Sequence, residues 1–253
     1  MLRRVLIANR GEIALRILRA CRELGIETVA VYSQADEEAL PVQLATLAVC
    51  IGPARATDSY LNQEALLTVA QSTGCDGIHP GYGFLSENGE FADACARQGL
   101  AFIGPSGDAI RRAGSKSAAK TRMKQAGVPV TPGSDGPVDS VEAARDAAKA
   151  VGYPVLLKAS AGGGGRGIRR VYREEELQEA FESAQAEAIA CFGSGEMYLE
   201  KLILRPRHIE VQILADRHGH VISLGDRDCS VQRRNQKLLE EAPAWGLSPA
   251  LRE

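Results

Sequence analysis

The chain has 253 residues, 45% of them hydrophobic and 25% charged, and its 30 Lys and Arg against 32 Asp and Glu give a net charge of −2. This is the composition of a globular protein with one large domain or two small ones, and it excludes a disordered chain, a collagen and a coiled coil. There is no basic excess to favour nucleic acid as a partner, and no apolar run approaches the ~20 residues that span a bilayer.

The N-terminus and the cysteines indicate a cytoplasmic protein. The apolar stretch from Val5 to Ala8 is too short for the core of a signal peptide, and no cleavage site follows it. The closest two of the six cysteines, Cys75 and Cys95, are 20 residues apart, so the sequence has no CxxC pair. We expect buried, reduced thiols rather than zinc ligands.

The first 112 residues alternate between short apolar runs and helical patterns, several of them closed by glycine. Repeated strand–helix–strand units predict an α/β fold with a parallel sheet. The expected strands are residues 2–8, 27–32, 77–79 and 101–103, and the expected helices are 13–24, 61–72 and 86–98, the last capped by Ser86.

After residue 114 the pattern changes to a basic helix, a hinge-like segment at 128–137 and a β-rich remainder. The expected helices are 116–126, 140–151 and 174–190, and the expected strands are 154–159, 168–171, 197–201, 208–215 and 221–225. His208, Glu210 and Gln212 alternate with apolar residues, which predicts a strand with one polar and one buried face. The last residues, LSPALRE, open a further helix at Pro249, so we expect the final domain to be incomplete.

The glycine run AGGGGRG, residues 161–167, is the strongest chemical signal. Consecutive glycines let several backbone N–H groups face one concave site, which suits a phosphate; the alternative is a flexible linker. The run formally satisfies GxGxxG, but a dinucleotide fingerprint needs a helix next, and the strand-like IRRVY follows instead. No Lys-Ser or Lys-Thr follows Gly167, so it is not a Walker loop either.

We interpret the run as the tip of a two-stranded hairpin over phosphates, with cations nearby. Lys158 ends the preceding strand, Arg166 lies in the run, and Lys116 opens a helix elsewhere. Such charges neutralise phosphate oxygens. A nicotinamide nucleotide at the turn Asn9–Glu12, with Asp36 on the ribose, is a weaker alternative, because that turn holds a single glycine.

Several motifs together resemble the N-terminal half of biotin carboxylase, the ATP-grasp module of biotin-dependent carboxylases such as acetyl-CoA carboxylase of fatty acid biosynthesis. The matching stretches, in family order, are IANRGEIA (7–14), HPGYGFLSEN (79–88), FIGPS (102–106), KASAGGGGRG (158–167), Glu200-Lys201 with PRHIEVQ (206–212), and RDCSVQRRNQKLLEEAP (227–243). HPGYGFLSEN and RDCSVQRRNQK are highly specific, whereas the glycine run alone fits many ATP-grasp enzymes.

The resemblance implies a reaction in which ATP and bicarbonate give carboxyphosphate, whose CO2 passes to N1 of biotin on a carrier. It implies a biotin carboxyl carrier protein or domain and a carboxyltransferase as partners, with a homodimer only partly encoded here, and no nucleic acid or membrane. It also implies a Rossmann-like domain at 1–112, a lid with its linking helix at 113–202, and the start of an incomplete ATP-grasp catalytic subdomain at 203–253.

The resemblance assigns roles residue by residue. Lys158 contacts phosphate, Glu200 accepts the adenine amino group, Lys201 supplies a backbone group, and His208 contacts ribose. Lys237 matches the catalytic lysine near bicarbonate and carboxyphosphate. The remaining nucleotide-binding matches are Lys116, Gly163, Gly164, Gly165, Arg166, Ile203 (placed to within one position), Gln232 and Asn235, which stands where some members carry His.

Two motifs keep structural alternatives. HPGYGFLSEN is interpreted as a scaffold turn beside the nucleotide, while RRNQK is too polar for a core and is assigned to the site. The family's metal-binding carboxylates, bicarbonate-binding arginine and catalytic glutamate are expected beyond residue 253, and Glu240 and Glu241 do not replace them. Ligands for Mg2+ or Mn2+ are therefore expected outside this chain, which alone should bind nucleotide weakly and turn over little.

Two other functions stay open. One is a non-catalytic fragment that only binds nucleotide or pairs with another chain. The other is a different ATP-grasp ligase, such as a carbamoyl-phosphate or purine-pathway enzyme, against which the two specific motifs argue.

Overall fold

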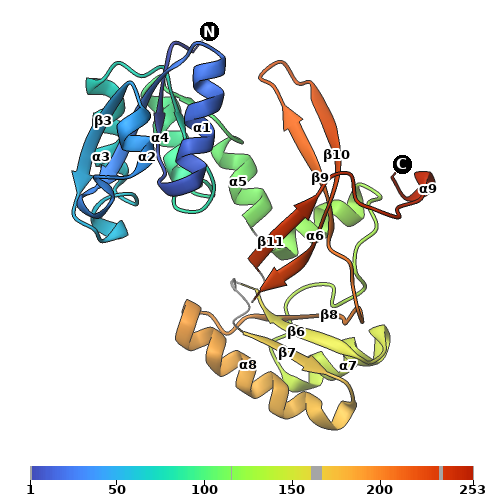
Figure 1. The fold of residues 1–253 in the computed structure, drawn as a ribbon. Coiled ribbons are helices and arrows are strands. Elements are labelled where there is room, and N and C mark those ends of the chain that lie inside the picture. The colour runs from blue at the N-terminus through green and yellow to red at the C-terminus, as the bar shows by residue number, and fades with distance from the viewer. Residues whose placement is uncertain (1, 115, 161–166, 234–235, 253) are drawn as a thin grey trace. The chain divides into compact units, whose positions relative to one another are not determined.

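The computed structural model describes residues 2–114, 116–160, 167–233 and 236–252 (Figure 1). The chain divides into two compact units, Met1–Ala119 and Lys120–Glu253. The finer division at residues 112 and 202 stays a prediction, and each part is described by itself.

The first unit is built on a five-stranded parallel sheet with the order β3-β2-β1-β4-β5. The strands are β1 (Arg4–Ile7), β2 (Glu27–Ser33), β3 (Leu47–Gly52), β4 (Gly77–His79) and β5 (Ala101–Phe102). The helices are α1 (Gly11–Glu23), α2 (Leu40–Leu44), α3 (Gln63–Ser72), α4 (Gly89–Arg97) and α5 (Gly107–Gly114), with 3-10 turns at Gln34–Asp36 and Ala56–Asp58.

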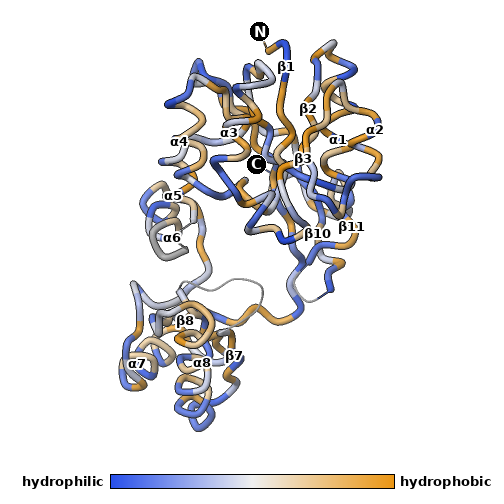
Figure 2. Tube along the Cα trace, turned by 90° about the vertical axis from the view of Figure 1, so that its left-hand side faces the viewer, coloured by the Kyte–Doolittle hydropathy of each residue, from blue (hydrophilic) through white to orange (hydrophobic). Residues whose placement is uncertain are grey.

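Both faces of this sheet are buried, as the continuous apolar runs of its strands predict. Val5 and Ile7 pack with Ile17 and Leu18 of α1 in one cluster. A second cluster joins Leu6, Val29 and Ile78 to Leu66 of α3 and Phe91 of α4. Figure 2 shows β2 as a largely hydrophobic strand within this unit. The α/β fold with a parallel sheet is therefore confirmed.

The ends of two helices follow local backbone chemistry. Gly25, after the end of α1, has φ +69°, a left-handed conformation that a glycine adopts without strain. The expected cap of α4 was wrong, because the helix begins at Gly89 and the side chain of Asn88, not Ser86, accepts a hydrogen bond from Phe91 N at 2.9 Å. The sequence patterns also missed β3, α2 and α5.

In the second unit, a three-stranded antiparallel sheet with the order β7-β6-β8 carries two helices. Its elements are α7 (Val141–Val151), β6 (Val155–Ala159), β7 (Ile168–Val171), a 3-10 turn at Glu174–Glu176, α8 (Leu177–Phe192) and β8 (Met197–Lys201). The sequence offered Asp139 or Ser140 as the cap of α7, and the structure shows Ser140, whose side chain accepts from Ala143 N at 3.1 Å. We call residues 131–201 the lid. The helix α6 (Lys116–Gln125), which precedes it, crosses the boundary between the units.

The predicted hairpin around the glycine run is confirmed in its two strands. β6 and β7 are antiparallel, with Lys158 opposite Ile168, and Ala159 N donates to Gly167 O at 2.9 Å. Residues 161–166 lie outside the described residues. A strand, not a helix, follows Gly167, which excludes a dinucleotide fingerprint here.

The last sheet has the antiparallel order β11-β10-β9 and ends before a short helix. Its elements are β9 (Ile209–Ala215), β10 (Val221–Arg233), β11 (Gln236–Glu241) and α9 (Pro249–Arg252). The start of a helix at Pro249 was predicted; the long continuation of β10 and the strand β11 were not.

Two expectations about burial were wrong. The apolar side of β9 is exposed, with Val211 at 54% and Ile213 at 52%, because no layer within the described part of the chain packs over it. All six cysteines are free, but Cys50 and Cys191 are exposed, while Cys21, Cys75, Cys95 and Cys229 are buried as expected. Within the ranges described, no helix is long and apolar enough to cross a membrane.

Candidate functional site

One face of the lid sheet carries the polar residues predicted to bind nucleotide. Along a strand, alternate side chains point to opposite faces. Val155 and Leu157 of β6 and Leu199 of β8 are fully buried in the core shared with α7 and α8. Lys158 and Glu200 therefore project from the opposite face.

Lys158 is held by two neighbours on β8. Its Nζ forms an ion pair and hydrogen bond with Glu200 Oε1, and the two side chains are only 23% and 16% exposed. Lys158 lies directly opposite Tyr198 in the strand register, with its Nζ 5.8 Å from the centroid of the tyrosine ring. Burial, and secondarily the negative charge of Glu200, raises the pKa of Tyr198 to about 12, so its phenol is neutral at physiological pH.

The side chain of Lys201 serves the fold, and only the backbone of this residue was expected at the site. Its Nζ donates to Gly152 O at 2.8 Å and to Tyr153 O at 2.9 Å, at the C-terminal end of α7. Its backbone N–H donates to Pro132 O at 2.7 Å, which leaves the carbonyl as the backbone group for a ligand. Ile203 follows β8 with 53% of its surface exposed.

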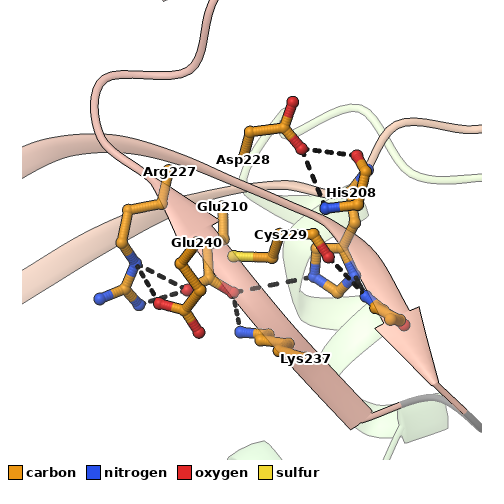
Figure 3. A network of polar contacts seen from close by, with 9 residues as sticks. His208, Glu210, Arg227, Asp228, Cys229, Lys237 and Glu240 are labelled. Carbon is orange, nitrogen blue, oxygen red and sulfur yellow. Dashed lines mark hydrogen bonds and ion pairs between the residues drawn. The ribbon is translucent and has the colours of Figure 1, made fainter.

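A second polar cluster lies on the sheet of β9, β10 and β11, and Glu210 is its centre (Figure 3). One oxygen of the Glu210 carboxylate accepts from Arg227 Nε at 2.9 Å, and the other accepts from Lys237 Nζ. The hydrogen bond from Lys237 is the first cause, and Arg227 a further one, of a Glu210 pKa of about 2. The same contacts raise the pKa values of Lys237 and Arg227, so all three groups are charged at neutral pH.

The same cluster includes the predicted ribose-binding histidine. Gln232 Nε2 lies 2.8 Å from His208 Nδ1, and because an amide nitrogen only donates, Nδ1 accepts. The other ring nitrogen, Nε2, lies 3.7 Å from Glu210 Oε2. Cys229 N donates to His208 O at 2.8 Å, which ties β10 to the residue before β9. The cluster therefore brings together His208, Gln232 and Lys237.

The cluster does not fit a metal ion. Glu210, Cys229 and Glu240 are the only group of metal-ligating side chains found close together among the residues described, with ligand atoms within 4.8 Å of one another. However, both oxygens of Glu210 already accept from cations, and Arg227 Nε also lies 3.6 Å from Glu240 Oε2. Burial first, and then Glu210, raises the pKa of the Cys229 thiol, which keeps it protonated and a poor ligand.

The two loop motifs of the first unit meet at the C-terminal ends of β1 and β4. Asn9, which is 4% exposed, donates to Pro80 O at 2.7 Å and to Tyr82 O at 2.8 Å. Gly81 has φ +64°, and a Cβ there would lie 2.8 Å from Asn9 Nδ2. This supports HPGYGF as a scaffold turn. A pocket of about 380 Å3 opens beside it, lined by Asn9, Arg10, Gly11, Glu12, Ile13, Tyr82, Gly83 and Phe84.

Asp36 is not available for a ribose. Its carboxylate accepts from Arg10 Nε at 2.8 Å, Tyr60 Oη at 2.7 Å and Ser33 Oγ at 2.9 Å. The bond from Arg10 is the largest contribution to an Asp36 pKa of about 2. The nicotinamide alternative therefore loses its ribose ligand.

Some predicted residues cannot be placed, and others were missed. Outside the described residues lie Gly163, Gly164, Gly165, Arg166 and Asn235, and also the side chain of Lys116, whose backbone begins α6.

The sequence did not single out Glu210, Arg227 or Tyr198. Glu210 follows His208 by two residues in the same alternating run, and Tyr198 precedes Glu200 by two residues, so strand periodicity carried a signal for both.

Comparisons with known proteins agree along the whole chain. Residues 1–110 match the family described as biotin carboxylase, N-terminal domain, and residues 115–253 match the carbamoyl-phosphate synthase L chain, ATP binding domain. Biotin carboxylase 1 of Bacillus subtilis is 56% identical over 253 residues, which is 100% of this chain and 56% of that protein. This chain thus spans about half the length of the curated relatives it matches.

Solved structures give the same result. A biotin carboxylase from Campylobacter jejuni, in complex with β-γ-ATP, superimposes with a TM-score of 0.94 at 53% identity, covering 100% of this chain and 56% of that one. The biotin carboxylase domain dimer of Hydrogenobacter thermophilus 2-oxoglutarate carboxylase, in complex with MgADP, ADP and bicarbonate, superimposes with a TM-score of 0.91 at 54% sequence identity. The match covers 100% of this chain and 55% of that one.

Proposed function

This chain belongs to the biotin carboxylase family, and from that premise we propose that it is the N-terminal part of an ATP-dependent ligase that carboxylates biotin on a carrier protein. In this reaction a bicarbonate oxygen attacks the γ-phosphorus of ATP, giving carboxyphosphate and ADP. Carboxyphosphate then breaks down to phosphate and CO2, which bonds to N1 of biotin as that nitrogen loses its proton.

The ion pair of Lys158 and Glu200 is the observation that carries the proposal. Adenine presents a hydrogen-bond donor at N6 beside an acceptor at N7. A carboxylate beside an ammonium offers the complementary acceptor and donor on one face of the lid. Lys158 also supplies positive charge for the phosphates, and the carbonyl of Lys201 is a further acceptor for the base. Lys116, Gly163–Gly165, Arg166, Ile203 and Asn235 complete the proposed nucleotide set.

The Glu210 cluster supplies the proposed environment for bicarbonate. Lys237 has a raised pKa because Glu210 accepts from it, so it acts as a fixed positive charge rather than as a base. A fixed charge stabilises carboxyphosphate without reorganising during the reaction. His208, held by Gln232, would bind the ribose through Nε2.

A divalent metal would neutralise charge on the transferred phosphoryl group. The Glu210, Cys229 and Glu240 group among the described residues does not suit such an ion, and ligands for Mg2+ or Mn2+ beyond residue 253 stay a prediction. The carrier protein or domain, the carboxyltransferase, a homodimer and a cytoplasmic location likewise stay predictions.

Replacing Lys158 tests the proposal in the full-length protein. We expect Lys158→Gln to abolish biotin-dependent ATP hydrolysis, measured as phosphate release with bicarbonate and free biotin. The matched control is Lys149→Gln, because Lys149 lies on α7 with its Nζ 3.3 Å from Glu174 and 57% of its side chain exposed. Unchanged turnover in the Lys158 variant would refute the assignment.

This chain spans only 56% of the length of Biotin carboxylase 1 of Bacillus subtilis. That observation favours a second candidate function, a fragment that binds nucleotide without catalysis. Residues 1–253 alone, assayed with ATP, Mg2+, bicarbonate and free biotin, separate the two. Measurable carboxybiotin would contradict the second candidate, and nucleotide binding without carboxybiotin would contradict an active fragment.

A further inference from the structure

Tyr198 is a buried aromatic residue on the polar face of the lid sheet. Its neighbours in β8, Met197 and Leu199, are fully buried on the opposite face, in the core with α7 and α8. Tyr198 points away from that core, as Lys158 and Glu200 do, and yet only 9% of it is exposed. Its burial therefore does not come from the helices that cover the other side.

The ring of Tyr198 instead lies against the lysine assigned to the nucleotide. The two residues are directly opposite in the antiparallel register, where cross-strand side chains interact most closely. The separation of 5.8 Å between Nζ and the ring centroid is within the range in which an ammonium is attracted to the negative face of an aromatic ring.

Glu200 adds the second contact from a diagonal position. It pairs with Leu156 in the register, two residues before Lys158 on the same face. The ammonium is thus held between a carboxylate and a neutral ring, both on β8. A lysine side chain loses considerable rotamer entropy when it is fixed, and these contacts fix it before a nucleotide arrives.

On the basis of the proposed function, we propose that Tyr198 is a positioning residue that holds the Lys158 ammonium for the nucleotide through the face of its ring. The ring touches the lysine, not the reacting atoms, so its removal weakens nucleotide binding more than it slows chemistry. Its hydroxyl is dispensable, because the attraction comes from the ring.

Substitutions at position 198 of the full-length protein separate ring from hydroxyl. We expect Tyr198→Leu to raise the KM for ATP about 3- to 10-fold with a smaller change in kcat, since cation–π contacts of this kind are modest. Tyr198→Phe should retain the wild-type KM. Tyr172→Leu is the control, because that lid tyrosine is 51% exposed and leaves the Lys158 contact intact. Thermal melting of each variant checks the fold.

A series of fluorinated phenylalanines at position 198 serves if the leucine variant does not fold. Fluorine withdraws electrons from the ring face at nearly constant size, so the KM should rise with each fluorine added. Three outcomes would overturn the inference. They are a KM that does not change along the fluorinated series, a Tyr198→Phe variant as impaired as Tyr198→Leu, and an unchanged KM in Tyr198→Leu. Lys158→Gln, assayed in parallel, distinguishes the failures: if it has no effect, the proposed function itself is wrong.

Discussion

Lys237 on β11 and Glu210 on β9 form an ion pair across the strand that separates them, β10. The intervening strand contributes Arg227, which lies opposite Glu210 in the register and binds its other oxygen. A single carboxylate thus fixes cations from two strands. The side chain of Glu210 is only 21% exposed and that of Lys237 36%, so this ion pair is less screened by solvent than a fully exposed pair.

We expect Glu210→Gln to lower kcat for biotin-dependent ATP hydrolysis by about 10- to 100-fold, because Lys237 loses the anion that holds it in place and a displaced charge would stabilise carboxyphosphate less well. The pKa of Lys237 should fall toward its ordinary value, since Glu210 is the main cause of its increase. Steady-state kinetics and a pH profile of kcat measure both effects. Glu179→Gln, on the exposed surface of α8, is the control. Wild-type kcat in Glu210→Gln would show that the cluster has no part in the reaction.

The Asp36 cluster makes a separate prediction about stability and pH. The pKa of Asp36 is about 2 in the folded protein against 3.8 ordinarily, chiefly because of Arg10. A lowered pKa means that the carboxylate stabilises the fold above pH ~4 and that this contribution is lost as the pH falls toward 2. Asp36→Asn should cost about 1–3 kcal/mol at pH 7 and make unfolding less dependent on pH between 5 and 2.

Urea unfolding of both proteins across that pH range measures the difference. Tyr60→Phe removes the hydrogen bond that Tyr60 Oη donates to Asp36 and the one that it accepts from Ser33 N, and it should cost about 1–3 kcal/mol. An acid limb with the same slope in Asp36→Asn and the wild type would contradict the assignment of the pKa shift.

The pair of Lys158 and Glu200 predicts selection of adenine over guanine. Guanine presents an acceptor at O6 where adenine has its N6 donor, so the carboxylate of Glu200 would repel it. Glu200→Gln offers an amide that can donate to O6, and we expect the ratio of kcat/KM for ATP over GTP to fall at least about tenfold. Glu196→Gln, an exposed residue just before β8, should leave the ratio unchanged. Equal use of ATP and GTP by the unaltered protein would refute this mode of recognition.

Sequence patterns located the strands of the lid but not their mutual register. The apolar run VLL places Lys158 near the end of β6, and period two along β8 places Glu200 on the same face as Tyr198. Which of these side chains meet depends on the pairing of β6 with β8, a long-range relationship that local periodicity does not contain. The contact between Lys158 and Tyr198 therefore became evident only in the structure.

The hairpin of β10 and β11 was harder to predict for a different reason. Register shifts between Ser223 and Asp226 and between Asp228 and Val231 interrupt the alternation of side chains, so the polar run there has no clear strand period. The family resemblance assigned His208, Gln232 and Lys237 to the site from two separate motifs, and their roles stay predictions. It did not reveal Glu210 as the neighbour of both His208 and Lys237, because that depends on three strands lying side by side.

Gly167 and Gly193 allow the cost of backbone conformation to be separated from the cost of a contact in the lid. Both have left-handed φ angles, +65° and +70°, which cost other residues about 1–2 kcal/mol. A Cβ at Gly193 meets nothing within 4 Å, whereas a Cβ at Gly167 would lie 2.8 Å from Ala159 Cβ, at the base of the glycine hairpin.

Gly193→Ala should therefore only lower stability, by about 1 kcal/mol, with an unchanged KM for ATP. Gly167→Ala should lower stability further and raise the KM, because it pushes β7 away from the residue next to Lys158. Chemical denaturation and ATP kinetics of the two variants measure this, and an equal KM in both would mean that the base of the hairpin does not control nucleotide binding.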